Sequence, residues 1–146
     1  MTGKAETAYT ALFALLQNVA GVVTVSRRLT DATNLSPSQQ PAIFINQTGE
    51  IIVPTKGFEG LNSKQQLTCD LYVYFSQNTQ EIVLTTQINA ILLAIRTALA
   101  PASPSMYQDL SGTVSHCWIS GKIEIIEGVQ NGQGMAIIPV NILTNF

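Results

Sequence analysis

Two stretches of the chain place apolar residues every three or four positions, which is the spacing of one face of an α-helix. The first starts at Thr2 or Gly3 and runs to about Val19, and Gly21 follows it as a stop signal. The second covers residues 78–99, where Asn78 and Glu81 have the spacing of a capping box. The pattern therefore predicts two amphipathic helices. Their apolar stripes are Ala5, Ala8, Leu12, Leu15, Leu16 and Val19 in the first, and Leu84, Ile88, Ile91, Leu92, Ile95 and Leu99 in the second.

Alternating or β-branched apolar residues predict strands between the helices. The clearest alternation covers residues 66–75, where every second residue is apolar and the intervening residues are polar or tyrosine. A β-branched run predicts a strand at residues 22–30. Shorter apolar runs predict strands at residues 41–47 and 50–53, and the sequence TGE between them is suited to a tight turn.

Two further strands are predicted after the second helix. They cover residues 113–128 and 135–143, and Asn131-Gly132 between them is a strong hairpin signal because both residues tolerate positive φ. Pro139 has no N–H to give to a neighbouring strand. The last strand is therefore expected to lie at a sheet edge or to carry a bulge.

These elements predict one α+β domain over residues 1–146, in the order α-β-β-β-α-β-β. Short connections between successive strands favour antiparallel pairing. Two amphipathic helices can then cover one face of the sheet. The expected fold is a mostly antiparallel sheet of four to five strands with two helices packed on one face.

Charged residues are scarce. They make up 11% of the chain, against roughly 25% in an average soluble domain. Such a surface repels other proteins weakly, so the chain is either a subunit that neighbours largely cover or a polar monomer. A net charge of −2 argues against a dedicated nucleic-acid binder, which needs a basic surface. No apolar run approaches the roughly 20 residues of a membrane span.

No set of residues has the spacing of a known catalytic or metal site. His116 is the only histidine, and a dyad with Cys69 requires that their two strands pair, with Cys117 then on the opposite face. Two cysteines and one histidine have no recognised zinc spacing. The sequence GVQNGQG lacks the GK[ST] ending of a phosphate-binding loop. We therefore expect no enzyme, no cofactor and no metal, two reduced buried thiols, and a histidine that is exposed or hydrogen-bonded.

Arg27 and Arg28 stand together at the end of a predicted strand, in a chain with seven basic residues. Alternation along a strand sends their side chains to opposite faces. Arginine suits protein interfaces because its planar fork pairs with carboxylates and carbonyls. The alternative is a pair of solvated side chains at a strand end. Trp118 leaves a similar choice between an interface anchor and core packing.

Three segments together resemble the tail terminator (tail completion) family of long-tailed bacteriophages. They are SRRLTDATNLSPSQQPAIFINQTGE, HCWISGKIEIIEG and GQGMAIIPVNIL. The shared features are an arginine pair at a strand end, QPA before a strand, and a hairpin leading to a strand that contains Ile-Pro. The order of helices and strands is also similar to that of the family, so the resemblance covers nearly the whole chain.

The resemblance implies a structural virion protein, assembled in the host cytoplasm, that forms a ring of commonly six subunits. The ring would cap the head-proximal end of the tail tube, stop its polymerisation and offer a surface for joining to the head. The implied partners are further copies of the chain, the tail tube protein and a connector or stopper protein. DNA would pass through the channel without specific binding.

Two sets of residues follow as hypotheses from this reading. One arginine of the pair Arg27 and Arg28 is expected to contact the next subunit. The glycine-rich segment 54–64 is expected to contact the tail tube, with the apolar anchors Phe58 and Leu61 and the charged Lys56 and Glu59. The alternatives are another phage joining or tube protein, whose tube form would polymerise into filaments, and an enzyme or small-ligand-binding α+β domain, which would have a pocket containing His116.

Overall fold

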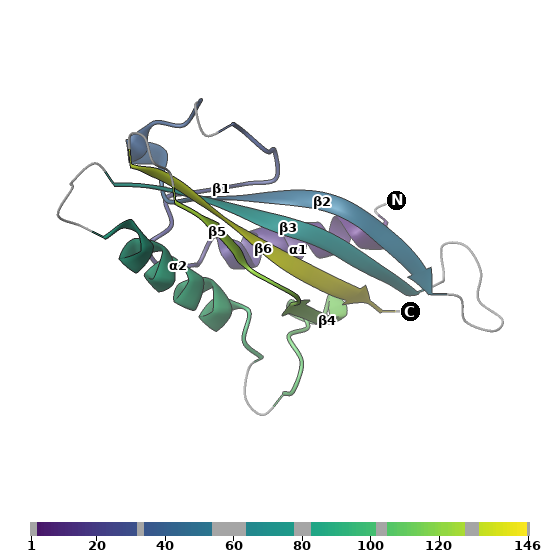
Figure 1. Ribbon diagram of the computed structural model, residues 1–146. Helices are drawn as coiled ribbons and strands as arrows, with labels where there is room; N and C mark the ends of the chain where they lie inside the picture. Colours follow the sequence, from purple (N-terminus) through teal and green to yellow (C-terminus); the bar gives the residue numbers. More distant parts are fainter. Residues whose placement is uncertain are drawn as a thin grey trace.

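The computed structural model describes residues 3–31, 34–53, 64–77, 83–101, 105–127 and 132–145, without the side chains of Val53 and Leu84. Over these residues the chain forms two α-helices, one short 3-10 helix and six strands, so the helices and strands follow the order α-β-β-β-α-β-β-β (Figure 1). The elements are α1 (Lys4–Leu16), β1 (Thr24–Ser26), η2 (Pro37–Gln39), β2 (Ala42–Val53), β3 (Lys64–Ser76), α2 (Leu84–Ala98), β4 (Val114–Ile119), β5 (Glu124–Ile126) and β6 (Gln133–Thr144).

The six strands form one mixed sheet in the order β1-β2-β3-β6-β4, and β5 pairs with β6 beyond the end of β4. Every pair is antiparallel except β1 with β2, which run parallel. The predicted α+β class and the mostly antiparallel sheet are confirmed. Each end of the sheet has a short strand: β1 covers only residues 42–44 of β2, and β5 covers only residues 135–137 of β6.

Both helices pack on the same face of the sheet, which we call the helix face (Figure 1). α1 buries Ala8, Leu12 and Leu16 there, in agreement with the predicted stripe. The alternation in β3 is also confirmed, because its odd-numbered residues from Leu67 to Phe75 are all buried in the same core. From α2 the buried side chains are Ile88, Ile91 and Ile95, with Leu99 just beyond its end; from β2 and β6 they are Ile43, Ile45, Ala136, Ile138, Val140 and Ile142.

The opposite face, which we call the open face, carries neither α1 nor α2 (Figure 1). One end of it is covered by a small cluster in which Phe44 and Tyr74 meet edge to face, with ring centroids 5.5 Å apart. Leu35, from the loop before β2, packs against this cluster. Gln40, in the same loop, exchanges amide hydrogen bonds of 3.0 and 3.1 Å with Gln133 at the start of β6. The loop is therefore anchored to the sheet at two points, by the apolar contact of Leu35 and by the amide pair of Gln40 and Gln133.

Pro139 lies in an interior strand whose register with β3 is unbroken, so both expectations for the last strand, an edge position and a bulge, are wrong. The carbonyl of Pro139 accepts a hydrogen bond from the Ser120 N–H at 3.0 Å, which shows that its backbone polar atoms face β4 and β5 rather than β3. β4 ends at Ile119 and β5 begins at Glu124, so the missing N–H of proline faces the gap between them. The predicted strand 113–128 is interrupted at that point.

The predicted tight turn within residues 48–50 is also wrong. β2 is one strand of 12 residues, and its register with β3 shifts between Gln47 and Gly49, which is a β-bulge. A continuous partner strand holds the extended backbone through the glycine, and a Cβ at Gly49 would approach the Thr68 hydroxyl at 3.7 Å.

The second helix is described from Leu84 onward; the predicted cap at Asn78 and Glu81 lies outside the described residues.

Candidate assembly surfaces

His116 is held in an aromatic stack and is not paired with a cysteine. Its ring stacks on Trp118 at a centroid distance of 4.9 Å, and Tyr107 meets it edge-on at 5.0 Å. Its Nδ1 accepts a hydrogen bond from the Gln108 N–H at 3.1 Å. Since β6 separates β3 from β4, the strands of Cys69 and His116 do not pair, and the condition for a dyad is not met. Trp118 is half-buried on the open face, outside the core.

The two thiols share the core on the helix face. Cys69 and Cys117 are both free and buried. Burial raises the pKa of each thiol to about 12, and for Cys69 the neighbouring Cys117 adds to the effect. Among the described residues, no three His, Cys, Asp or Glu side chains form a group that could hold a metal ion. None of the described helices combines the length and the apolar character needed to cross a membrane.

We expect both thiols to be protected from a thiol reagent such as DTNB in the native protein at neutral pH. The thiolate is the reactive form, and neither thiol can ionise or contact the reagent without local opening. Labelling should be on the order of a thousandfold or more slower than in the urea-unfolded chain. Absorbance at the dye wavelength with time measures this. Labelling of the folded protein at the rate of the unfolded chain would contradict the burial of these residues.

The two neighbouring arginines have different surroundings. The Arg27 guanidinium, just after β1, donates to both carboxylate oxygens of Glu6 in α1, at 2.5 and 3.0 Å. It also lies over the ring of Tyr9, 5.8 Å from the centroid. Arg27 thus ties the end of β1 to α1 within the same chain. Arg28 is exposed, and among the described residues only its backbone is seen to bond: its N–H donates to the Ser26 hydroxyl at 3.0 Å, and its carbonyl accepts from the Thr30 hydroxyl at 3.4 Å.

Replacing Glu6 with glutamine should weaken the fold slightly at neutral pH. The Arg27 hydrogen bond lowers the pKa of Glu6, so its stabilising effect is present above the ordinary carboxyl pKa and is lost as pH falls through the lowered value. The difference between the wild type and Glu6→Gln in urea melts should therefore disappear in acid and shrink in high salt. Asp109→Asn removes another exposed carboxylate and serves as the control. A difference that is unchanged by acid would contradict the ion pair.

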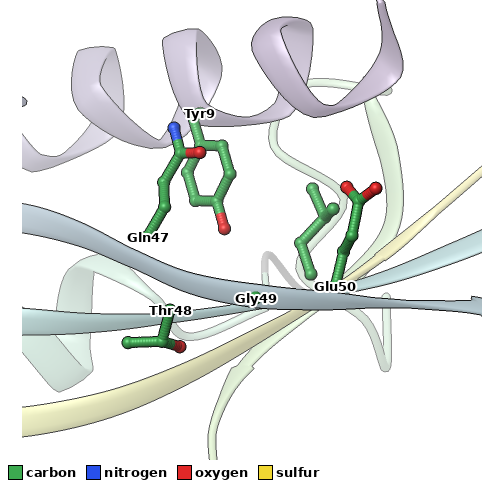
Figure 2. Close-up of a pocket in the computed structure, with 6 residues that line it drawn as sticks. Tyr9, Gln47, Thr48, Gly49 and Glu50 are labelled. Atoms are coloured by element: carbon green, nitrogen blue, oxygen red, sulfur yellow. The ribbon is translucent and has the colours of Figure 1, made fainter.

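A groove of about 310 Å³ lies between α1 and the bulge of β2. Tyr9 reaches into it from the helix, Gln47 and Glu50 project toward it from β2, and Thr48 points to the other face (Figure 2). The Tyr9 hydroxyl donates to the Thr68 carbonyl at 3.2 Å, and burial raises the pKa of Tyr9 well above its ordinary value. The side chain is thus a hydrogen-bonded part of the wall, not an acid or base at neutral pH.

The open face presents half-buried side chains with few charges. Asp70 of β3 and Glu124 of β5 are its neighbouring carboxylates, and burial together with Glu124 raises the pKa of Asp70. Around them the face is apolar or neutral, and the described residues place no layer of secondary structure on it beyond the small cluster at one end. The half-buried side chains are Thr68, Tyr72, His116, Trp118, Ile137, Pro139, Asn141 and Leu143.

Two stretches of the sheet border have no strand partner among the described residues. One is the side of residues 45–52 of β2 that faces away from β3, which we call the β2 free edge; the other is the side of β5 that faces away from β6, which we call the β5 free edge. Both have the same triplet, Glu-Ile-Ile, at residues 50–52 and 124–126. Sequence reasoning missed these edges, although adjacent isoleucines in a strand point to opposite faces and so indicate apolar groups on both sides.

The expected tube-contact residues Lys56, Phe58, Glu59 and Leu61 lie outside the described residues. Their role stays a prediction.

The geometry defines a small α+β domain with one covered face and incompletely paired edges. No family model matches the chain, and no curated protein matches it. A chain in a solved structure described as "Virion of native gene transfer agent (GTA) particle" is similar in fold, with 10% identity and a TM-score of 0.47 over 97% of this chain and 91% of that chain. At that identity and TM-score the likeness does not carry an argument about function.

Proposed function

We propose that this chain is a structural virion protein that forms a ring on the head-proximal end of a phage tail tube, ends tube polymerisation and provides the surface for joining to the head. The three segments that resemble the tail terminator family support the proposal. The observation that carries it is the incompletely covered sheet, because the open face and the two free edges are surfaces that a neighbour in an assembly can cover.

A ring is the assembly that fits these surfaces best. The two free edges lie on different borders of the sheet, so a contact between them is head-to-tail, and head-to-tail contacts produce a ring when the rotation closes. Several weak contacts made at once by the ring then hold it on the symmetric end of a tube. Few charges on the open face, with the acidic Asp70 and Glu124 among them, would let DNA pass through the channel without binding.

The test begins with the wild-type protein by light scattering after size exclusion, with negative-stain images of the same peak. We expect closed rings, alone or after mixing with tail tubes, and tubes that stop growing once the ring is bound. Deletion of residues 56–62 should spare folding but leave tube length uncontrolled. Filaments of the protein alone would favour a tube subunit, and a strict monomer that leaves tube length unchanged would overturn the proposal.

Within this proposal, Arg28 is the arginine that contacts the next subunit. Because Arg27 is engaged with Glu6, Arg27→Ala should lower the stability of each subunit, whereas Arg28→Ala should weaken the ring and leave subunit melting within about 0.5 kcal/mol of the wild type. Ring mass on dilution and urea melts separate the two effects. Rings that survive dilution equally well in Arg28→Ala and the wild type would remove this arginine from the interface.

A further inference from the structure

We propose that the β2 free edge of one copy pairs antiparallel with the β5 free edge of the next, so that the sheets of neighbouring subunits join around the ring. This inference rests on the proposed function, since it specifies how the ring closes. The occupant of each free edge is thus a second copy of this chain.

The first observation is that these edges are uncovered while neighbouring parts of the same borders are not. β1 pairs with β2 only as far as Phe44, and β2 then continues for nine more residues. On the other border, the loop before β4 bonds to β4 through Cys117 N–H to the Gln108 carbonyl at 2.8 Å and Val114 N–H to the Asp109 carbonyl at 3.0 Å. β5 receives no such cover from the described residues.

The second observation is the apolar character of both edges. Exposed fractions are 56% for Ile51 and 47% for Ile52 on the β2 free edge, and 43% for Ile125 and 48% for Ile126 on the β5 free edge. Natural proteins usually protect edge strands with charge, proline or very short length. β5 is short and both edges carry glutamates, but the two exposed isoleucines on each edge are apolar surface that pairing with another strand would bury.

Strand direction makes the two edges complementary. β2 and β6 are each antiparallel to β3, and β5 is antiparallel to β6, so β5 runs antiparallel to β2 within one subunit. Rotation about a ring axis leaves the direction of a strand along that axis unchanged. The β5 of one copy therefore meets the β2 of the next in antiparallel orientation, which is the more stable way for strands to pair.

The side chains on the two edges also match by face. Ile52 pairs with Gln65 and Ile125 with Ala136, which places both isoleucines on the helix face; Ile51 and Ile126 lie on the open face. An antiparallel alignment that brings Ile52 beside Ile125 also brings Ile51 beside Ile126. The same alignment places Glu127 directly opposite Glu50 at the end of the pairing, where both carboxylates are exposed and water screens their repulsion.

The positions of the two edges along the strands fit a closed sheet. The register of β5 with β6, of β6 with β3 and of β3 with β2 places β5 level with residues 42–44 of β2. The β2 free edge, residues 45–52, lies toward the other end of β2. Joining them displaces each subunit along the strand direction by the same amount, and a closed sheet requires such a stagger. The helices would lie on the outside, where the circumference is longer, and the open face would line the channel.

The first experiment is disulfide cross-linking with Ile52→Cys and Ile125→Cys in the same chain. After mild oxidation of assembled rings, we expect a ladder of covalent oligomers on a non-reducing gel, ending at the ring. The native thiols do not interfere because both are buried. Ile125→Cys combined with Leu93→Cys, on the exposed side of α2, is the matched control and should give no ladder. Rings that give no ladder with the first pair would overturn the edge contact.

The second experiment tests the other isoleucine pair by charge. Ile51→Lys should raise the concentration needed for half assembly by roughly tenfold or more, since a lysine would be buried against Ile126 without a partner. Adding Ile126→Glu to the same chain should restore assembly, and Leu93→Lys should leave it unchanged. If Ile51→Lys fails to fold, the cross-linking decides. Rings unaffected by Ile51→Lys would refute the edge contact alone, whereas a wild type that forms no rings, even on tubes, would refute the proposed function as well.

Discussion

Replacing Leu71 with alanine is expected to lower the free energy of unfolding by about 2–5 kcal/mol, because it opens a cavity at the centre of the core. Leu71 is fully buried in β3 and lies between Ile45 of β2 and Ile138 of β6 in the register of the sheet. Neighbouring strands are fixed by their own hydrogen bonds and cannot close the cavity. A loss of this size is a large part of the about 5–15 kcal/mol that stabilises a typical domain.

Urea unfolding followed by circular dichroism measures the loss as a shift of the midpoint. Leu93→Ala removes the same atoms from a side chain of α2 that is 65% exposed, so it should change stability by less than about 0.5 kcal/mol. Equal midpoints for the two variants would show that β3 does not lie at the centre of the core.

The second large effect is expected from Gln133→Ala, at about 1–3 kcal/mol. The Gln133 amide accepts from and donates to Gln40, and it also donates to the Phe75 and Gly134 carbonyls at 3.2 and 3.0 Å. Gln40 is 7% exposed, so water cannot replace the lost partner without rearrangement of the loop. The cost arises from an unsatisfied buried amide rather than from the lost contact itself.

A double-mutant cycle separates these contributions. Gln40→Ala should cost a similar amount, and the double variant should cost less than the sum, because the second substitution removes the amide that the first left unsatisfied. Gln17→Ala, an exposed glutamine after α1, is the control for the loss of the side chain alone. A double variant whose loss of stability equals the sum of the two single losses would mean that the amides do not bond to each other.

The sequence predicted those parts of the fold in which local pattern and tertiary environment agree. The stripe of α1 and the alternation in β3 both reflect burial on one face, which is visible in a single segment. Gly49 and Pro139 were misread because each depends on a partner far away in sequence. A glycine at a bulge gives the same local signal as a glycine in a turn, and a proline in an interior strand is possible only because the opposite strand is interrupted.

The candidate surfaces were harder to predict than the fold. Local sequence marked Arg27 and Arg28 as a pair, but the bond to Glu6 links residues that are 21 positions apart and leaves only Arg28 exposed. A free edge arises where a long strand extends past a short neighbour or where a strand has no outer neighbour. The sequence does not show this, because it depends on the places of β1 and β5 in the sheet. The Glu-Ile-Ile triplets were the local sign of these edges.

The place of β6 in the sheet has a consequence for synthesis of the protein. β6 is the partner of β3, β4 and β5, yet it is made after all three of them. When the ribosome has completed β3, this strand can pair only with β2 until the residues of β6, from Gln133 onward, emerge. During that time a second unsatisfied edge is exposed beside β3, so crowded translation of this chain favours contacts between nascent copies.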